Sequence, residues 1–423
     1  MIVKRAVITG IGMCVPGGVG RKEFWEFITS GRTATRPISL FDASRFRSRI
    51  AAEVDWDPIA EGFTEHEVAK FDRVLQFALY SLREALDDSG LSVQPVAPER
   101  IGVAVGTAIG ATMSLDRQYA ATSHTGERWL VDHTRADPWI FDYFVPSSMA
   151  REIAWRAGAE GPATVVSTGC TSGMDSIGYA LELIREGTSD VVITGASDAP
   201  ISPITSACFD AIKATTPRND DPERACRPFD ITRNGFVLGE GAAIVVLEEY
   251  EHAVRRGAHI YAEVAGFATR CNAYHMTGLR PDGAEMAEAI TVSMGQARVN
   301  PEDFGYISAH GSGTKQNDLH ETAAFKTSLG AAAYGVPISS IKAAIGHALG
   351  SVGSIELATC ALAIEHGVVP PTATLHDPDP ECDLDYIPRT AREARVDVAL
   401  SVASGFGGFQ SAAVLRGPRS WSA

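Results

Sequence analysis

The sequence predicts an α/β protein in which a buried mixed sheet carries helices on both of its faces. Short β-branched and apolar runs alternate with longer stretches of helical periodicity, and glycine-rich joints separate them. The series strand–helix–strand–helix–strand–strand occurs twice, and the second series begins near residue 255. We therefore expect two related halves, residues 1–255 and 256–423. Because no low-complexity linker lies between them, we expect the halves to pack as one body.

In the first half, the pattern predicts strands that alternate with two helices. The first strand, AVITG at 6–10, ends in a glycine turn. A helix over 66–89 is indicated by leucines at helical spacing, namely Leu75, Leu79, Leu82 and Leu86. The other predicted strands are 101–106, 164–167, 191–195 and 242–249, and the second predicted helix is 172–185.

The second half repeats this alternation. Its predicted strands are 261–269, 306–310, 337–341, 398–404 and 411–415. Its predicted helices are 284–298, 319–329 and 351–366, and a glycine-rich turn joins the last two strands.

Charge and composition exclude several classes of protein. The net charge of −15 and the pI of about 5.2 oppose binding to nucleic acid or to anionic lipid. No apolar run reaches the roughly 18 residues of a membrane span. The strand-like N-terminal MIVKRAVITG leaves no room for a secretory signal, so we expect a cytoplasmic protein. The seven cysteines form no C-x-x-C motif, so we expect reduced thiols rather than disulfides or a zinc site.

Cys170 lies in STGCTSGMDSIGYALELIRE, between a predicted strand and a predicted helix. The N–H groups and the dipole at a helix N-terminus stabilise a thiolate, so this position predicts a lowered thiol pKa. Small neighbouring residues leave room for a substrate, and the same N–H groups can donate to an oxyanion. Taken alone, the pattern fits a reactive nucleophile and a small buried cysteine equally well.

His310 closes the predicted strand YISAH and precedes a glycine-rich loop. Open α/β sheets place ligands at this end of a strand, although a histidine here can also simply cap the loop. Asp318 and Glu321 follow, three residues apart on one face of a predicted helix start. They either orient a cation or cap the helix, as acidic residues do.

The segment SSIKAAIGHALGSVGSIELA combines a lysine, a histidine and a carboxylate. Lys342 ends a predicted strand, and His347 begins a helix whose dipole disfavours the charged imidazolium, so we expect a neutral ring. Glu356 lies in an apolar stretch, where an unpaired carboxylate is costly, so Lys342 is its expected partner. The pair is either support for catalysis or a structural salt bridge.

Glycine-rich turns occur near both ends of the chain. Gly405, Gly407 and Gly408 separate the last two strands and permit close backbone approach, although a plain β-turn needs glycine as well. The N-terminal GIGMCVPGG departs from the dinucleotide fingerprint because Val15 occupies the third glycine position. We therefore do not expect nucleotide binding.

A cysteine at a strand–helix joint, two histidines, a lysine and a terminal GFGG turn occur in this order. The arrangement resembles the β-ketoacyl synthases of the thiolase-like superfamily over the whole chain. It is most similar to the ketosynthase α subunit of bacterial type II polyketide synthases for aromatic products, which serve antibiotic biosynthesis. The matching strings include GRTATRPISLFD, VSTGCTSGMDSIGYA, HGSGTKQND and ASGFGGFQSA. The segment KAAIGHALGSVGS departs from the subfamily's usual KSMVGHSLGAIGS but keeps Lys342 and His347.

The resemblance implies a thiolase-like fold, in which duplicated halves form a five-layer α-β-α-β-α sandwich. It implies that Cys170 takes an acyl chain from the phosphopantetheine arm of an acyl carrier protein, with backbone N–H groups of Cys170 and Phe406 as the oxyanion hole. His310 and His347 would then stabilise the enolate that forms when malonyl-carrier protein loses CO₂. Lys342 would hold the histidines together with three carboxylates, Asp318, Glu321 and Glu356. No metal, nucleotide or redox cofactor is implied.

The resemblance also implies two protein partners, the acyl carrier protein and a chain length factor that completes a heterodimer. The chain length factor lacks the active-site cysteine, so Cys170 identifies this chain with the other subunit. Carrier proteins of this family are acidic, and the cationic residues offered for docking are Lys70, Arg73 and Arg218. A fatty-acid elongating synthase, which acts as a homodimer, is the alternative within the family. A non-catalytic scaffold subunit is the alternative from another class, and the intact cysteine and histidines argue against it.

Overall fold

The computed structural model describes residues 4–91 and 96–421. Its ten main strands follow one hydrogen-bonded path that divides into two five-stranded sheets of the same design, one in each half of the chain. In the first half the order is β1 (Ala6–Val15), β9 (Gly241–Glu249), β7 (Val191–Asp198), β5 (Ile101–Gly106) and β6 (Ala163–Val166). In the second half the order is β10 (Ala262–Cys271), β16 (Phe409–Arg416), β15 (Val398–Gly405), β11 (Tyr306–Ser308) and β12 (Ile338–Ser339).

The two sheets share strand direction as well as strand order. In each sheet the first two neighbouring pairs of strands are antiparallel and the last two pairs are parallel. The sheets meet where β1 pairs with β10 through two residue pairs, Val7 with Glu263 and Ile8 with Ala262. The duplication expected from the order of elements is therefore present in the topology.

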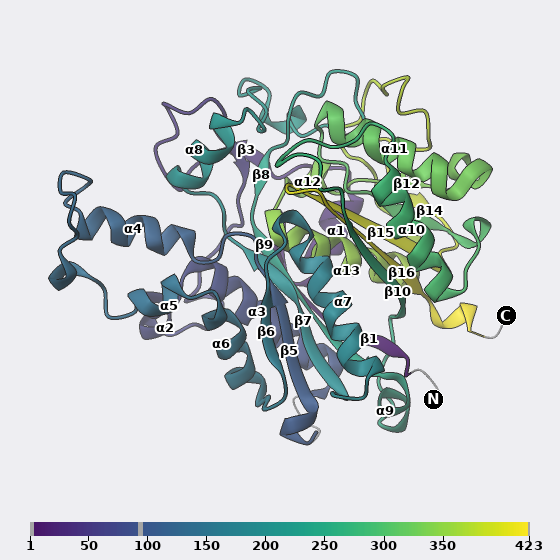
Figure 1. Cartoon of the computed structure of the whole chain (residues 1–423), viewed down its shortest axis with the longest axis horizontal. Coiled ribbons are helices and arrows are strands. Elements are labelled where there is room, and N and C mark those ends of the chain that lie inside the picture. The colour runs from purple at the N-terminus through teal and green to yellow at the C-terminus, as the bar shows by residue number, and fades with distance from the viewer. Residues whose placement is uncertain (1–3, 92–95, 422–423) are drawn as a thin grey trace.

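Helices cover and separate the two sheets, as Figure 1 shows. α7 (Ser172–Arg185) and α13 (Val352–His366) pack against each other and against strands of both sheets, so they form the middle layer. α3 (Arg73–Ser89) and α6 (Ser147–Ala157) cover the outer face of the first sheet, and α10 (Ala284–Ala297) covers that of the second beside α11 (Lys315–Leu329). The result is the five-layer sandwich.

Smaller elements complete the described chain. The helices are α1 (Arg21–Thr29), α2 (Glu65–Lys70), α4 (Thr112–Thr122), α5 (Ile140–Phe144), α8 (Pro203–Ala211), α9 (Tyr250–Arg255) and α12 (Lys342–Ile345). The short strands are β2 (Gly18–Val19), β3 (Thr35–Pro37), β4 (Ile50–Ala52), β8 (Leu238–Gly239), β13 (Val368–Val369) and β14 (Arg392–Glu393). Among the described helices, none combines the length and the apolar character that crossing a bilayer requires.

The single helix predicted over 66–89 is wrong in one respect, because the chain breaks it into α2 and α3. Phe71 and Asp72 between the two helices have extended backbone angles. The carboxylate of Asp72 accepts a hydrogen bond from the N–H of Val74, so it caps α3 and starts a new helix. The leucine spacing is continuous across this break and gives no sign of it.

An arm, residues 112–144, extends from the body of the molecule and was not predicted as structure. It begins with α4 and ends with α5, and Figure 1 shows α4 reaching away from both sheets. It exposes several large apolar side chains: Trp129 is 96% exposed and Leu130 is 80% exposed. Three further residues of the arm, Tyr119, Phe141 and Phe144, are also exposed.

Candidate active site

The turn that carries Cys170 lies between β6 and α7, as predicted. Residues Gly169–Thr171 form one 3-10 turn, and α7 starts at Ser172. Gly169 has φ +64°, a left-handed conformation that glycine adopts without strain. The turn thus places Cys170 directly before the N-terminus of a 14-residue helix.

The expected low pKa of this thiol is wrong. Burial raises the pKa of the Cys170 thiol to about 12, and the nearby charge of Lys342 and the backbone N–H of Phe406 oppose that rise without overcoming it. The negative charge of Asp198 adds to the rise. Desolvation of the thiolate at this largely enclosed position outweighs the stabilisation from the helix N-terminus.

His310 lies just beyond the end of β11, because that strand stops at Ser308 rather than at 310. Glu321 on α11 accepts hydrogen bonds from the backbone N–H groups of His310 and Gly311, at 2.6 and 2.8 Å. This carboxylate therefore fixes the main chain that carries the imidazole. Burial raises the pKa of Glu321 to about 8.

His347 is held by a different part of the chain. The backbone N–H of His347 donates to the carbonyl of Val237 and its backbone carbonyl accepts from the N–H of Gly239, so the segment 237–239 holds the main chain of His347. The N–H of Leu349 donates to Nδ1 of His347 at 3.1 Å, which leaves the proton of a neutral ring on Nε2. The imidazole can therefore donate a hydrogen bond from Nε2.

The two imidazoles meet, with ring centroids 5.3 Å apart. Burial and the charge of Lys342 lower the pKa of both rings well below the usual value, so both are neutral near pH 7. The neutral His347 agrees with the sequence analysis, but burial and Lys342 account for it rather than a helix dipole.

Lys342 lies at the centre of the charged groups and is fully buried. Its Nζ donates to Glu356 Oε1 and to the carbonyl of His310, and it lies 3.4 Å from Nδ1 of the same ring. The predicted Lys342–Glu356 pair is present, and burial raises the pKa of Glu356 to about 7. The lysine begins α12 rather than ending a strand, because β12 stops at Ser339.

Asp318, by contrast, contacts neither histidine. It pairs with the buried Arg233 at 3.1 Å and accepts from the N–H groups of Phe229 and Gly313. It therefore shapes the loop after His310 rather than the rings themselves, which corrects its expected place among the groups that hold the histidines. Arg233 was not among the predicted site residues, because the segment RPFDITRNGF that contains it has no periodic signal.

Cys170, His310, His347 and Phe406 line one cavity of about 190 Å³. The cysteine comes from the first half and the other three from the second, so the site forms only when both halves are in place. The GFGG turn covers the cysteine, and a Cβ placed on Gly405 would lie 3.4 Å from the backbone nitrogen of Cys170. The remaining walls are mixed, with apolar Phe209, Ile212, Phe236 and Leu279 and polar Thr277, Thr314, Gln316 and Asn317.

The three residues predicted for docking do not line this cavity. Lys70 pairs with Glu152 at 2.9 Å, and Arg73 forms two hydrogen bonds with the buried Glu240. Each of these two charges is thus paired with a buried carboxylate. Arg218 has no carboxylate within 4 Å among the described residues and lies at the surface.

This geometry is that of a thiolase-like condensing enzyme, an acyltransferase that works through a cysteine thioester. The chain belongs to the beta-ketoacyl synthase family: the N-terminal domain of that family matches residues 4–253, and the C-terminal domain matches residues 261–376.

Curated relatives point to one branch of the family. The tetracenomycin polyketide synthase ketoacyl synthase alpha subunit of Streptomyces glaucescens is 67% identical, over 98% of each chain. The actinorhodin polyketide putative beta-ketoacyl synthase 1 of Streptomyces coelicolor is 59% identical, over 98% of this chain and 88% of the relative. A 3-oxoacyl-[acyl-carrier-protein] synthase 2 of Synechocystis is 39% identical over 96% of each. The similarity is therefore greater to these two polyketide ketoacyl synthases than to the 3-oxoacyl-[acyl-carrier-protein] synthase 2.

Solved structures agree on the fold. A complex of a type II polyketide synthase acyl-carrier protein with its ketosynthase, bound to the hexaketide, superposes with a TM-score of 0.91 at 38% identity, covering 98% of this chain and 99% of the other. The ishigamide ketosynthase/chain length factor gives a TM-score of 0.90 at 33% identity, with the same coverage. The thiolase-like fold expected from the sequence is confirmed.

Proposed function

We propose that Cys170 accepts the growing acyl chain and that His310 and His347 activate the malonyl unit that extends it, in a ketosynthase α subunit of a type II polyketide synthase. The observation that carries this proposal is the convergence of a thiol and two neutral imidazoles, from opposite halves of the chain, on one cavity.

Acylation is the first step. The sulfur of Cys170 attacks the thioester carbonyl of a carrier-bound acyl chain, and backbone N–H groups of Cys170 and Phe406 donate to the oxyanion. The bond from Cys170 to the acyl carbon forms and the bond to the carrier sulfur breaks. The thiol proton leaves with the carrier's sulfur, so no proton is gained or lost overall.

Condensation follows on a malonyl group. Nε2 protons of His310 and His347 donate to its thioester oxygen, which stabilises the enolate that remains when the carboxylate departs as CO₂. The enolate carbon attacks the acyl-Cys170 carbonyl, a carbon–carbon bond forms, and the sulfur of Cys170 leaves and takes up a proton. Neutral rings suit this task because each offers one fixed donor, and Lys342 favours the neutral state of both.

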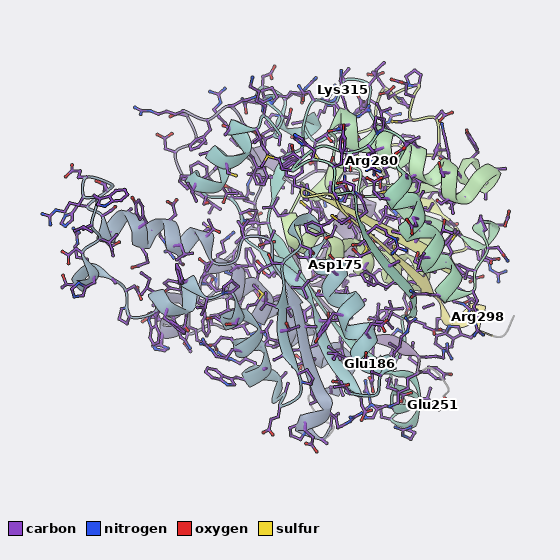
Figure 2. The ribbon with its side chains drawn as sticks, viewed as in Figure 1. Asp175, Glu186, Glu251, Arg280, Arg298 and Lys315 are labelled. Atoms are coloured by element: carbon purple, nitrogen blue, oxygen red, sulfur yellow. The ribbon has the colours of Figure 1, made fainter. Side chains whose placement is uncertain are left out.

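Acyl groups arrive on the phosphopantetheine arm of an acyl carrier protein, which is a substrate rather than a resident cofactor. The rim of the cavity offers a basic surface for an acidic carrier. Lys213, Arg280 and Lys315 each adjoin a residue of the cavity wall in sequence, and within residues 4–91 and 96–421 none has a carboxylate within 4 Å. Figure 2 shows Arg280 and Lys315 on the same side of the molecule. We propose this rim for docking in place of Lys70 and Arg73, whose charges are already paired.

Charge reversal at the rim tests this placement. Lys315→Glu should weaken carrier binding about tenfold and flatten its dependence on salt, because a charge contact is lost. Arg298→Glu is the matched control, since Arg298 is a surface arginine far from Lys315 in Figure 2. Equal affinities for the two variants, measured by fluorescence anisotropy across a salt series, would remove the rim from the docking surface.

A second subunit completes the enzyme in this proposal. The arm exposes several large apolar side chains, among them Trp129 and Leu130, and such exposure is typical of a protein interface. We propose that a chain length factor covers it, as a heterodimer partner.

The function is tested by condensation with malonyl-loaded carrier protein. The protein purified with its second subunit should form polyketide products, Cys170→Ala should form none, and His347→Ala should be slower by about two to three orders of magnitude. Product formation by Cys170→Ala would refute the assignment. Products formed without a second kind of subunit, from a homodimer that makes fatty-acid intermediates, would favour the alternative within the family.

A further inference from the structure

Two carboxylates beside the site, one fully buried and one partly buried, have no basic partner among the described residues. They are Asp175 on α7 and Asp198 at the end of β7. Neither forms an ion pair, and only hydroxyl and backbone N–H groups donate to them. Burial of an unpaired carboxylate is costly, so each must be stabilised by the donors around it.

Asp175 ties down the turn that carries the nucleophile. Its Oδ2 accepts hydrogen bonds from the hydroxyls of Thr168 and Thr171, at 2.5 and 2.8 Å, and these residues flank Cys170 on both sides. Its Oδ1 accepts from Ser411 at 2.5 Å, on β16 of the second half. Figure 2 shows Asp175 in the middle of the molecule.

The bond to Ser411 links the nucleophile to the turn that covers it. Ser411 pairs across the strands with Ala403 of β15, and β15 leads directly into the GFGG turn with Phe406. The carboxylate of Asp175 therefore joins the turn that carries Cys170 to the hairpin of β15 and β16, and the backbone N–H of Phe406 in that hairpin faces the thiol. The two proposed donors to the oxyanion are the backbone N–H of Cys170 in the first half and that of Phe406 in the second. The hydrogen bond between Asp175 and Ser411 therefore helps to fix the distance between these two N–H groups.

Asp198 holds the other part of the machinery. Its carboxylate accepts from the Thr107 hydroxyl and the N–H of Ala108 on one side, at 2.7 and 2.8 Å. On the other side it accepts from the N–H of Gly350 at 2.8 Å, three residues after His347.

The turn between His347 and Gly350 needs such support. Leu349 has φ +47°, a left-handed conformation that costs energy for any residue with a side chain. In this conformation the N–H of Leu349 donates to Nδ1 of His347, which sets the tautomer of the ring. Asp198 anchors the next residue, so it holds the strained turn that orients the imidazole.

We propose that Asp175 and Asp198 are positioning residues for two separate parts of the condensation, Asp175 for the nucleophile Cys170 and Asp198 for the enolate-stabilising His347. The proposal rests on the roles given to Cys170 and His347 above. It predicts that the two carboxylates can be distinguished by the half-reaction that each supports.

Two rates measured on the same protein test it. The first is acylation of Cys170 by a carrier-bound acyl thioester, and the second is CO₂ release from malonyl-carrier protein. Asp175→Asn should slow acylation about tenfold or more and leave CO₂ release within about threefold, since small displacements of reacting groups cost up to about 10²-fold. Asp198→Asn should do the reverse. Its acylation rate should hold or rise, because removal of this negative charge lowers the thiol pKa.

Milder variants keep the test decisive if either carboxamide variant folds poorly. Thr171→Val removes one donor to Asp175, and Thr107→Val removes one donor to Asp198, whereas the serine variants at both positions keep the hydroxyl. Thr171→Val should slow acylation alone and Thr107→Val should slow CO₂ release alone, whereas the serine variants should keep the wild-type rates. Glu182→Gln on the exposed side of α7 is the control and should change neither rate.

Parallel loss of both rates in both variants, or loss in neither, would overturn the proposal. Wild-type protein that shows neither rate would instead refute the proposed function, so the two failures can be told apart.

Discussion

Cys170 is a protonated thiol at rest, so its reactivity depends on loss of the proton during the reaction rather than on a thiolate that is already present. Burial keeps the thiol protonated at neutral pH, and the stabilising groups nearby are one ammonium, one backbone N–H and a helix N-terminus. These groups can stabilise charge as it develops in the transition state even though they do not ionise the resting thiol. A neutral resting thiol also makes the cysteine less prone to oxidation.

The pH dependence of alkylation tests this state directly. With a thiol pKa of about 12, the thiolate fraction rises tenfold per pH unit from pH 7 to pH 9, and so should the rate of alkylation of Cys170 by iodoacetamide. Mass spectrometry of the Cys170 peptide separates this reaction from that of the exposed Cys208 and Cys271. A rate that levels off below pH 8.5 would show a stabilised thiolate and contradict the expected slope.

The buried pair of Lys342 and Glu356 gives a second prediction at this scale. Lys342→Met leaves Glu356 buried without a partner, which should lower the free energy of unfolding by about 3–5 kcal/mol. Lys342→Met with Glu356→Gln should recover most of that loss, because no uncompensated charge remains. Urea unfolding at pH 8 measures both. Equal destabilisation of the single and double variants would mean that packing, not charge, accounts for the loss.

At the scale of elements, the site depends on the close approach of α7 and α13. Cys170 lies just before α7 and His347 lies five residues before α13, so the crossing of the two helices sets the distance between the thiol and the imidazole. Gly173 lies at the contact, where an added Cβ would come within 2.7 Å of the Ser354 nitrogen and 2.8 Å of the Gly350 carbonyl oxygen. Backbone atoms cannot yield as a flexible side chain would.

Gly173→Ala should therefore separate the two helices. We expect a loss of about 1–3 kcal/mol in the free energy of unfolding and a larger relative loss of condensation than of stability. Gly295→Ala in α10 is the matched control, because a Cβ there meets nothing within 4 Å and helix propensity should make it neutral or stabilising by up to about 1 kcal/mol. Full activity in Gly173→Ala would argue against a fixed crossing distance.

Sequence patterns predicted elements well where burial is continuous. The strand 101–106 and the helix 172–185 occur with the predicted bounds, since an apolar run or an apolar face defines each of them. The strand ends beyond Ser308 and Ser339 were placed too late, because side chains accept the backbone N–H groups that follow: Glu321 accepts from His310 and Thr372 accepts from Ser340. The link from Asp175 to Ser411 joins residues 236 positions apart, and no local pattern encodes such a contact.

The direction of the pKa shift at Cys170 could not be predicted from the sequence either. Cys170, His310, His347, Lys342 and Glu356 could be named from their positions at strand ends and helix starts. The direction of the thiol pKa could not, because it depends on how completely the GFGG turn closes over the cysteine. The arm was missed for a simpler reason: its apolar residues face solvent and show no helical periodicity.

At the scale of the whole molecule, duplication explains why the active site lies where it does. Two sheets of one design place their middle helices back to back, so the N-terminal ends of α7 and α13 meet between the halves. The arm is an insertion after β5 that breaks this symmetry, since the matching strand β11 leads directly to α11. Met113 packs against the core of the first half and Tyr143 is buried, but Trp129 and Leu130 join no core cluster among the described residues, so any stabilisation of these two side chains by burial comes from outside the chain.

Substitution within the arm tests whether a second subunit supplies that stabilisation. Trp129→Ser with Leu130→Ser should weaken the complex with the chain length factor at least about a hundredfold, because buried aromatic and aliphatic anchors dominate interfaces. Tyr334→Ser, at another exposed aromatic residue in the second half, should leave the complex intact. Co-purification with a tagged partner, followed by light scattering, measures both and distinguishes a heterodimer from a homodimer by mass. Stoichiometric recovery of the partner with the double variant would mean that the arm is not the interface with the chain length factor, and that a different partner covers Trp129.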